Sequence, residues 1–124
     1  MNTIPKISDS EWKIMKIIWE KSNCNANEIV TALKTVEMWS PKTIKSLISR
    51  LLKKKVIDYD QVGRTYKYYP LFSEDECAKL ERKSFLQRVY NGSLKTMLLN
   101  FIEDDPLSIE QLDELKNMLE ERKE

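Results

Sequence analysis

The chain has 124 residues, 41% hydrophobic and 33% charged, which is enough for one ordinary domain or a small domain with an attached module. It contains no histidine, which excludes imidazole metal sites, histidine general bases and every triad that needs one. The net charge of +1 conceals an asymmetry: residues 1–73 carry 13 Lys and Arg against 7 Asp and Glu, whereas residues 74–124 carry 8 against 13, so the first half is the one suited to a polyanion.

Three helices are expected in the first half, and each follows an N-cap signal. Ser8 and Glu11 have the spacing of a capping box, and Asn25 repeats that pattern before the second apolar stripe. Ser40 is a good N-cap for the third helix, with Pro41 at the first helical position, where proline is best tolerated. Two short helices and a brief connection before the third predict a helix-turn-helix.

The third expected helix has two different faces. One side is apolar and carries Ile44, Leu47, Ile48, Leu51 and Leu52. The other side has no acid between Ser40 and Val56, and we predict that it binds DNA through Lys42, Thr43, Lys45, Ser46, Ser49, Arg50 and Lys53. The first four residues are expected near base edges and the last three at the phosphate backbone. A charged face that is merely solvated is the alternative, but it does not explain the absence of acids.

A β-hairpin is predicted after the third helix. Residues 56–62 and 65–69 are rich in β-branched and aromatic side chains, and Gly63-Arg64 lies between them. Three helices followed by a hairpin are the element order of a winged helix. Arg64 at the tip and Lys67 just inside it are expected to reach the DNA backbone or minor groove, although simple solvation is an equal alternative for Lys67.

The second half is expected to be helical throughout. One helix should run from Glu74 to about Tyr90, and two shorter helices should follow it. Three short helices in about 50 residues expose more apolar surface than they can bury alone. We therefore predict a winged-helix DNA-binding domain at 1–73 and a three-helix dimerisation domain at 74–124. The homodimer would form through Leu94, Met97, Leu98, Phe101, Ile102, Ile109, Leu112, Leu115 and Leu119.

Other classes of protein are disfavoured by what the sequence lacks. Cys24 and Cys77 form no CxxC pair, so neither a zinc cluster nor a dithiol motif is supported. Neither a Gly-rich phosphate loop nor a group of convergent carboxylates is present, so we expect no enzyme and no cofactor. A signal peptide and an apolar run of roughly 18 residues are also missing, and we expect a cytoplasmic protein without membrane insertion.

Three segments resemble a known family. They are ISDSEWKIMKIIWEK with the following NANEI, WSPKTIKSLISRLLKKK, and KTMLLNFIEDDPLSIEQLDELKNML. In order and spacing they are similar to the penicillinase-repressor family of bacterial winged-helix repressors, the BlaI/MecI/CopY group, from about Ile7 to Leu119. The resemblance is greatest to the β-lactam-responsive branch, because the paired C-terminal cysteines of the copper-responsive branch are missing.

The resemblance implies a homodimer that blocks transcription at dyad operators with TACA/TGTA-type half-sites, ahead of a β-lactamase or penicillin-binding-protein operon. It also implies that a membrane sensor of β-lactam triggers proteolysis of the repressor at an Asn-Phe bond, which here is Asn100-Phe101. Cutting there would remove the last helix and much of the dimer contact, so two half-sites would no longer be bound together.

Several positions depart from the family pattern. Members commonly have Arg where Lys45 stands and Thr where Ser46 and Ser49 stand, and Lys cannot make the bidentate contact of Arg. Lys55 replaces a glycine suited to a left-handed helix end. The operator can therefore differ. A repressor of another regulon and a winged-helix module that binds an acidic protein remain the alternatives.

Overall fold

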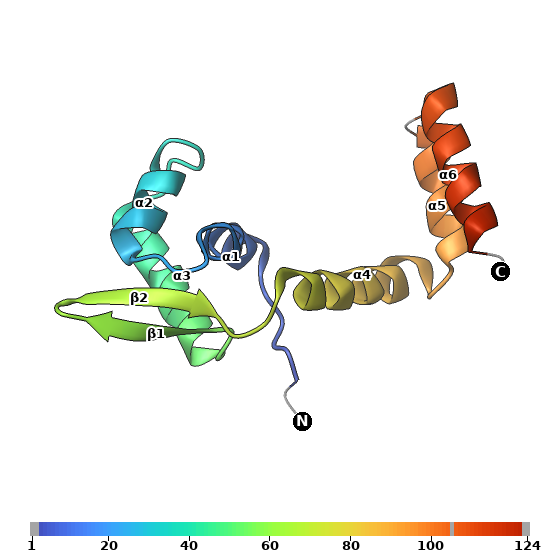
Figure 1. Ribbon diagram of the computed structural model, residues 1–124. Helices are drawn as coiled ribbons and strands as arrows, with labels where there is room; N and C mark the ends of the chain where they lie inside the picture. The colour runs from blue at the N-terminus through green and yellow to red at the C-terminus, as the bar shows by residue number, and fades with distance from the viewer. Residues whose placement is uncertain (1–2, 105, 123–124) are drawn as a thin grey trace. The chain divides into compact units, whose positions relative to one another are not determined.

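The computed structural model describes residues 3–104 and 106–122. Within them it has six helices and one antiparallel hairpin, so the expected fold class is confirmed (Figure 1). No helix in this described part is both long and apolar enough to cross a bilayer. The elements are α1 (Asp9–Lys21), α2 (Ala26–Lys34), α3 (Pro41–Lys53), β1 (Ile57–Val62), β2 (Thr65–Pro70), α4 (Glu74–Tyr90), α5 (Leu94–Asp104) and α6 (Ile109–Glu121).

Side-chain caps determine where the first three helices begin. Ser8 Oγ accepts a hydrogen bond from the Glu11 N–H at 3.2 Å, and Glu11 Oε1 accepts one from the Ser8 N–H at 2.8 Å. Asn25 and Glu28 make the same reciprocal pair at the start of α2, and Ser40 caps α3 through its hydroxyl. Each cap satisfies N–H groups that a helix start otherwise leaves unpaired. The three N-caps expected from the sequence are confirmed.

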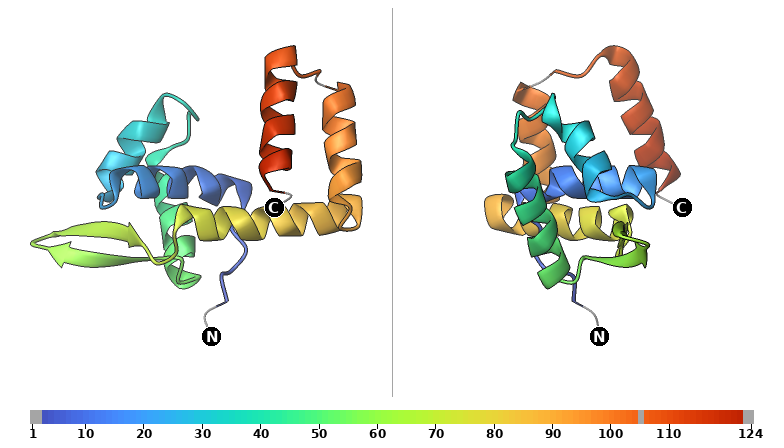
Figure 2. Two further views of the ribbon diagram at one scale, coloured as in Figure 1. Left: turned by 45° about the vertical axis from the view of Figure 1, so that its right-hand side comes forward. Right: turned by 90° about the vertical axis from the view of Figure 1, so that its left-hand side faces the viewer.

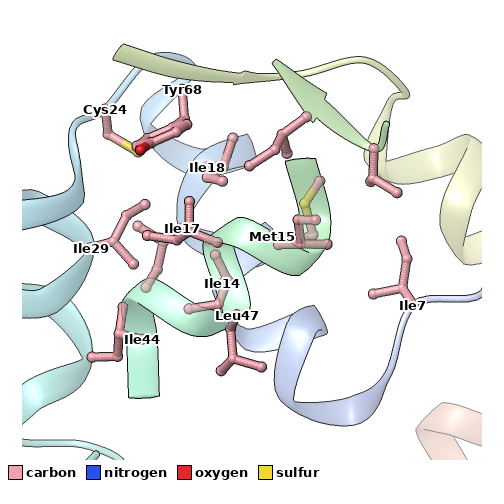
Figure 3. Close-up of a cluster of buried hydrophobic side chains, with 14 of the residues drawn as sticks. Ile7, Ile14, Met15, Ile17, Ile18, Cys24, Ile29, Ile44, Leu47 and Tyr68 are labelled. Atoms are coloured by element: carbon pink, nitrogen blue, oxygen red, sulfur yellow. The ribbon is translucent and has the colours of Figure 1, made fainter. Parts of the chain in front are cut away.

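One hydrophobic core joins α1, α2, α3 and the hairpin. Figure 3 shows Ile14, Ile29, Ile44 and their neighbours pointing toward one another from three helices. Each fully buried aliphatic side chain of this kind stabilises the fold by about 1.5–3 kcal/mol relative to leaving it exposed. The fully buried apolar side chains include Ile14, Met15, Ile18, Ile29, Ile44, Leu51, Val56 and Ile57.

The end of α3 is a left-handed turn of the Schellman type. Lys55 has φ 61°, and its N–H donates to the Leu52 carbonyl at 3.1 Å. The Val56 N–H donates to the Leu51 carbonyl at 3.1 Å, and both of these side chains are fully buried. This geometry usually places glycine where Lys55 stands, because a Cβ costs roughly 1–2 kcal/mol in the left-handed region.

The hairpin turns within two residues. Val62 pairs with Thr65, so Gly63 and Arg64 make the connection, and Gly63 has φ 65°. A glycine with positive φ at the first turn position suits the right-handed twist of the two strands. The sequence prediction that Arg64 lies at the tip of the wing is thereby confirmed.

The base of the hairpin is attached to the segment between α1 and α2. The Cys24 N–H donates to the Tyr68 carbonyl at 3.1 Å, and the Tyr68 N–H donates to the Cys24 carbonyl at 2.8 Å. The Cys24 side chain is fully buried, and burial raises the pKa of its thiol. Cys24 thus packs as part of the hydrophobic core.

The chain divides into two compact units, Met1–Lys79 and Leu80–Glu124, and the division falls inside α4. The first turn of α4 belongs to the first unit, since Cys77 is only 2% exposed and lies in its core. Glu74 pairs with Lys16 of α1, and the carbonyl of Phe72, just before α4, accepts a hydrogen bond from Trp19 Nε1 at 2.9 Å. Several contacts therefore fix the start of α4.

The second unit leaves many of its apolar side chains exposed. Figures 1 and 2 show α5 and α6 as two antiparallel helices joined by a short connection. Neither helix buries any of its described residues. Leu94 is 53% exposed, Phe101 49% and Leu119 58%. A hydrophobic surface of this kind calls for a partner.

Candidate nucleic-acid interface

The two faces of α3 are separated as the sequence predicts. Its apolar side faces the core, where α3 contacts α1 and α2. The side chains of Ile44, Leu47 and Leu51 on this side are each at most 4% exposed. All seven candidate DNA-binding side chains of α3 are exposed: Lys42, Thr43, Lys45, Ser46, Ser49, Arg50 and Lys53. The helix therefore docks with its apolar side and presents a polar side to solvent.

The cations on this face are available to a ligand. Among the residues that the structure describes, the ion pairs are Lys13–Glu37, Lys16–Glu74, Lys54–Glu11 and Lys67–Glu28. None of them involves a cation of the exposed α3 face. An anion that approached this face would not need to displace a carboxylate.

The hydroxyl groups at the start of α3 are organised by its cap. Ser40 Oγ accepts from the Thr43 N–H at 3.2 Å and lies 3.0 Å from Thr43 Oγ1. The contact between the two hydroxyls orients the Thr43 side chain before any ligand binds. The N-terminal residues of a recognition helix are those that contact base edges. The cap therefore orients a side chain at a position suited to contact a base.

Within the part of the chain that the structure describes, one of the two wing cations is paired with a carboxylate and the other is not. Arg64 is exposed at the tip, whereas Lys67 is half-buried, with its Nζ 3.3 Å from Glu28 Oε1. The Asn25 backbone N–H and the Lys67 ammonium both lower the pKa of Glu28, so this carboxyl group is charged at neutral pH. In the protein without DNA, Lys67 therefore links the wing to α2.

A hollow brings α3 and the wing together. It has a volume of about 220 Å³, and Lys45 of α3 and Arg64 of the wing both line it. Five further polar residues line it as well: Asn25 and Asn27 at the start of α2, and Thr65, Tyr66 and Tyr68 of β2. The sequence prediction missed these five, although Tyr66 could have been found, because it lies two residues before the buried Tyr68 and so shares one face of the strand with it.

The residues of the expected cleavage site lie in α5. Asn100 and Phe101 are both exposed and both helical. Among the expected dimerisation residues, Met97, Ile102 and Leu115 are half-buried and the rest are exposed. These side chains thus form an apolar surface spread over two helices.

This arrangement suits double-stranded DNA. The major groove admits one α-helix, and hydroxyl, ammonium and guanidinium groups are donors to phosphates and base edges. A protruding hairpin beside that helix can contact the neighbouring backbone. The first unit therefore has the shape and the chemistry of a winged-helix reader.

Comparisons with known proteins agree with this architecture. The family model for the penicillinase repressor matches residues 7–121. The chain is 44% identical to a penicillinase repressor of Bacillus licheniformis, over 99% of this chain and 96% of the relative. It is 38% identical to the methicillin resistance regulatory protein MecI of Staphylococcus aureus, over 98% of each chain.

Solved structures give the same result for the first unit. The DNA-binding domain of the repressor BlaI superposes with a TM-score of 0.55 at 41% identity, over 61% of this chain and 93% of that one. BlaI of Bacillus licheniformis, solved as a monomer in complex with the blaP half-operator, gives 0.54 at the same identity and coverage. With a full-length match to the family model and the winged-helix unit in place, the chain belongs to the penicillinase repressor family of transcriptional repressors.

Proposed function

We propose that this protein is a homodimeric repressor of β-lactam-resistance genes that binds a dyad operator with TACA/TGTA-type half-sites. The acid-free, exposed face of α3 is the observation that carries the proposal. It is supported by the names of the relatives, a penicillinase repressor and a methicillin resistance regulator, and by the half-operator bound to BlaI in its solved complex. A protein with this role acts in the cytoplasm, where the operator is.

Roles can be assigned along the interface. Lys42, Thr43, Lys45 and Ser46 would meet base edges in the major groove, while Ser49, Arg50 and Lys53 would hold the backbone. Arg64 would reach the backbone or minor groove from the wing tip. Lys67 either leaves Glu28 to contact DNA or keeps the wing against α2, and its position 3.3 Å from Glu28 favours the second role.

The first test is fluorescence anisotropy with a labelled duplex that carries the TACA/TGTA dyad, against a scrambled duplex, over a salt series. Binding of the dyad should be tighter by about 10³-fold or more, and it should weaken steeply as salt rises because bound phosphates release counterions. Equal, weak binding of both duplexes would overturn the operator assignment. A strong preference for another dyad would keep a repressor but change its regulon.

The dimer part of the proposal is supported by the second unit. A hollow on α6 is lined by Leu112, Leu115 and Leu119 together with the charged residues beside them. Because α5 and α6 leave this surface open within their own unit, a second copy of the chain is the natural cover. Light scattering should give twice the chain mass at micromolar concentration, and the mass of one chain would contradict the proposal.

We also propose that repression ends by cleavage between Asn100 and Phe101, after a β-lactam sensor activates a protease. A protease needs an extended backbone, and α5 is easy to unfold locally because it buries no residue. Loss of α6 would separate the two half-site readers and remove the gain of binding both together. Mass spectrometry after incubation with extract of β-lactam-induced cells should find this cut. An intact chain, or a cut at another bond, would exclude it.

A further inference from the structure

Glu11 is the one charged side chain that is fully buried among the residues that the structure describes. Its Oε1 accepts hydrogen bonds from the Ser8 N–H at 2.8 Å and from Lys54 Nζ at 2.5 Å. Its Oε2 has no hydrogen-bond partner in the described part of the chain. A buried carboxylate is tolerated only with a cation beside it, so the charge of Glu11 depends on Lys54.

Lys54 belongs by sequence to the basic run Lys53–Lys55, but its side chain points away from the DNA-binding face. It is the C-cap of α3, and its Nζ also donates to the Lys6 carbonyl at 2.9 Å. One ammonium group therefore connects the segment before α1, the first turn of α1 and the end of the recognition helix. The two bonded side chains are 43 residues apart in the sequence.

We propose that Lys54 acts on DNA only through Glu11: the pair of buried Glu11 and half-buried Lys54 is a positioning device that fixes the end of α3 against α1 and so sets the angle at which the recognition helix meets the operator. The proposal rests on the proposed DNA-binding function. It assigns roles in DNA recognition to Glu11, which lies outside the interface, and to Lys54, which a reading of the basic run alone would place on a phosphate.

The protonation state of Glu11 fits this role. Burial raises its pKa, but the hydrogen bonds from Lys54 and Ser8 together lower it by more, so the pKa lies below the ordinary value of a glutamate. The carboxylate is therefore charged at neutral pH. A buried carboxylate holds the geometry of its cation contact more strictly than a neutral group would, because misalignment leaves the charge of Glu11 unsolvated.

The neighbouring lysines provide a matched experiment. Lys53→Met removes an exposed cation of the DNA-binding face, whereas Lys54→Met removes the partner of Glu11. Each variant loses one positive charge, and the two positions are adjacent in the sequence. Binding of the dyad and of a scrambled duplex is measured by anisotropy over a salt series, for the full chain and under conditions where circular dichroism shows each variant folded. Glu11→Gln and the double variant E11Q/K54M complete a double-mutant cycle.

Lys53→Met should weaken binding of both duplexes alike and reduce the salt slope by about one, as loss of a phosphate contact does. Lys54→Met should leave the slope unchanged and reduce the ratio of dyad to scrambled affinity by about tenfold. Glu11→Gln, which changes no surface charge, should reduce the same ratio. The double variant should lose less than the two single losses multiplied together, because the pair acts as a unit.

The outcomes separate the inference from the function on which it rests. A wild-type protein that does not prefer the dyad overturns both. If the wild type does discriminate, a Lys54→Met variant that loses salt slope as Lys53→Met does would make Lys54 a phosphate contact. An unchanged affinity ratio in Lys54→Met or Glu11→Gln, or strictly independent effects of the two changes, would reduce the pair to a purely structural bond.

Discussion

Lys55 carries a left-handed backbone, with φ 61°, at a position where the Schellman turn favours glycine. Its N–H and that of Val56 make both closing hydrogen bonds of the turn, so the turn forms in spite of the side chain. The sequence identifies the position, because the family commonly has glycine there. What it does not reveal is that the backbone keeps the left-handed conformation when lysine replaces that glycine.

Lys55→Gly should therefore stabilise the protein by about 1 kcal/mol, the steric cost of a Cβ in the left-handed region less the extra chain entropy of glycine. Urea unfolding measures the change. Lys53→Gly is the control, because the same substitution two residues earlier falls on the last helical residue of α3 and should destabilise, by up to about 1 kcal/mol. Loss of stability in both variants would contradict the assignment of strain to Lys55.

The pH dependence of stability provides a test of Glu11. Its pKa in the folded protein is lowered, so its contribution to stability is complete above the unfolded value of about 4.3 and disappears as the pH falls through the folded value. Glu11→Gln should be less stable than wild type at neutral pH, and the difference should shrink as the solution is acidified. Chemical unfolding at several pH values measures this.

Glu28→Gln is the matched control for that series. The pKa of Glu28 is also lowered, but this carboxylate is half-exposed and its contact with Lys67 is 3.3 Å long. Solvent screens such a pair, so its effect on stability and its dependence on pH should be weaker. A stronger dependence for Glu28→Gln than for Glu11→Gln would show that burial is not the deciding factor.

At the scale of the element, the starts of the helices were predictable because their signals are local. Ser8 and Glu11, or Asn25 and Glu28, are three residues apart and make their bonds within one turn. The partners of Lys54 and Lys67 lie 43 and 39 residues away, and no pattern in the chain indicates them. Whether a lysine contacts another element or stays exposed depends on how the helices pack in three dimensions.

The cap of α3 connects stability with DNA reading. Ser40→Ala removes the acceptor of the Thr43 N–H and should destabilise the protein by about 1 kcal/mol. It also removes the contact with Thr43 Oγ1, so dyad affinity should fall further than the loss of stability explains. Ser49→Ala, an exposed position inside the same helix, should not destabilise the protein, because alanine is the better helix former. Equal losses of stability in the two variants would argue against the cap.

At the scale of the whole molecule, α5 and α6 expose apolar side chains. A second copy of the chain is proposed to cover them. Leu112→Glu places a charge on the surface proposed to meet that copy, where Leu112 is 41% exposed. We expect the variant to run as a monomer in light scattering at a concentration where the wild type is dimeric. We also expect its melting temperature to be independent of protein concentration, because no association remains to stabilise it.

Val36→Glu is the control for that experiment, because it adds the same charge at a side chain that is 72% exposed in the first unit. This variant should remain dimeric. If both variants dissociated, net charge rather than the α6 surface would be responsible. If neither did, the dimer contact would lie elsewhere, and the function of the exposed leucines would need another explanation.

Cys77 lies in the core of the first unit although it stands on α4, one turn beyond residue 73, where composition alone divides the chain. A fragment cut at residue 73 would lose this buried side chain and the Lys16–Glu74 pair, and water would reach the core. One that ends at Lys79 would keep both. The DNA-reading part of this protein can thus be separated from the rest only together with the first turn of the helix that leaves it.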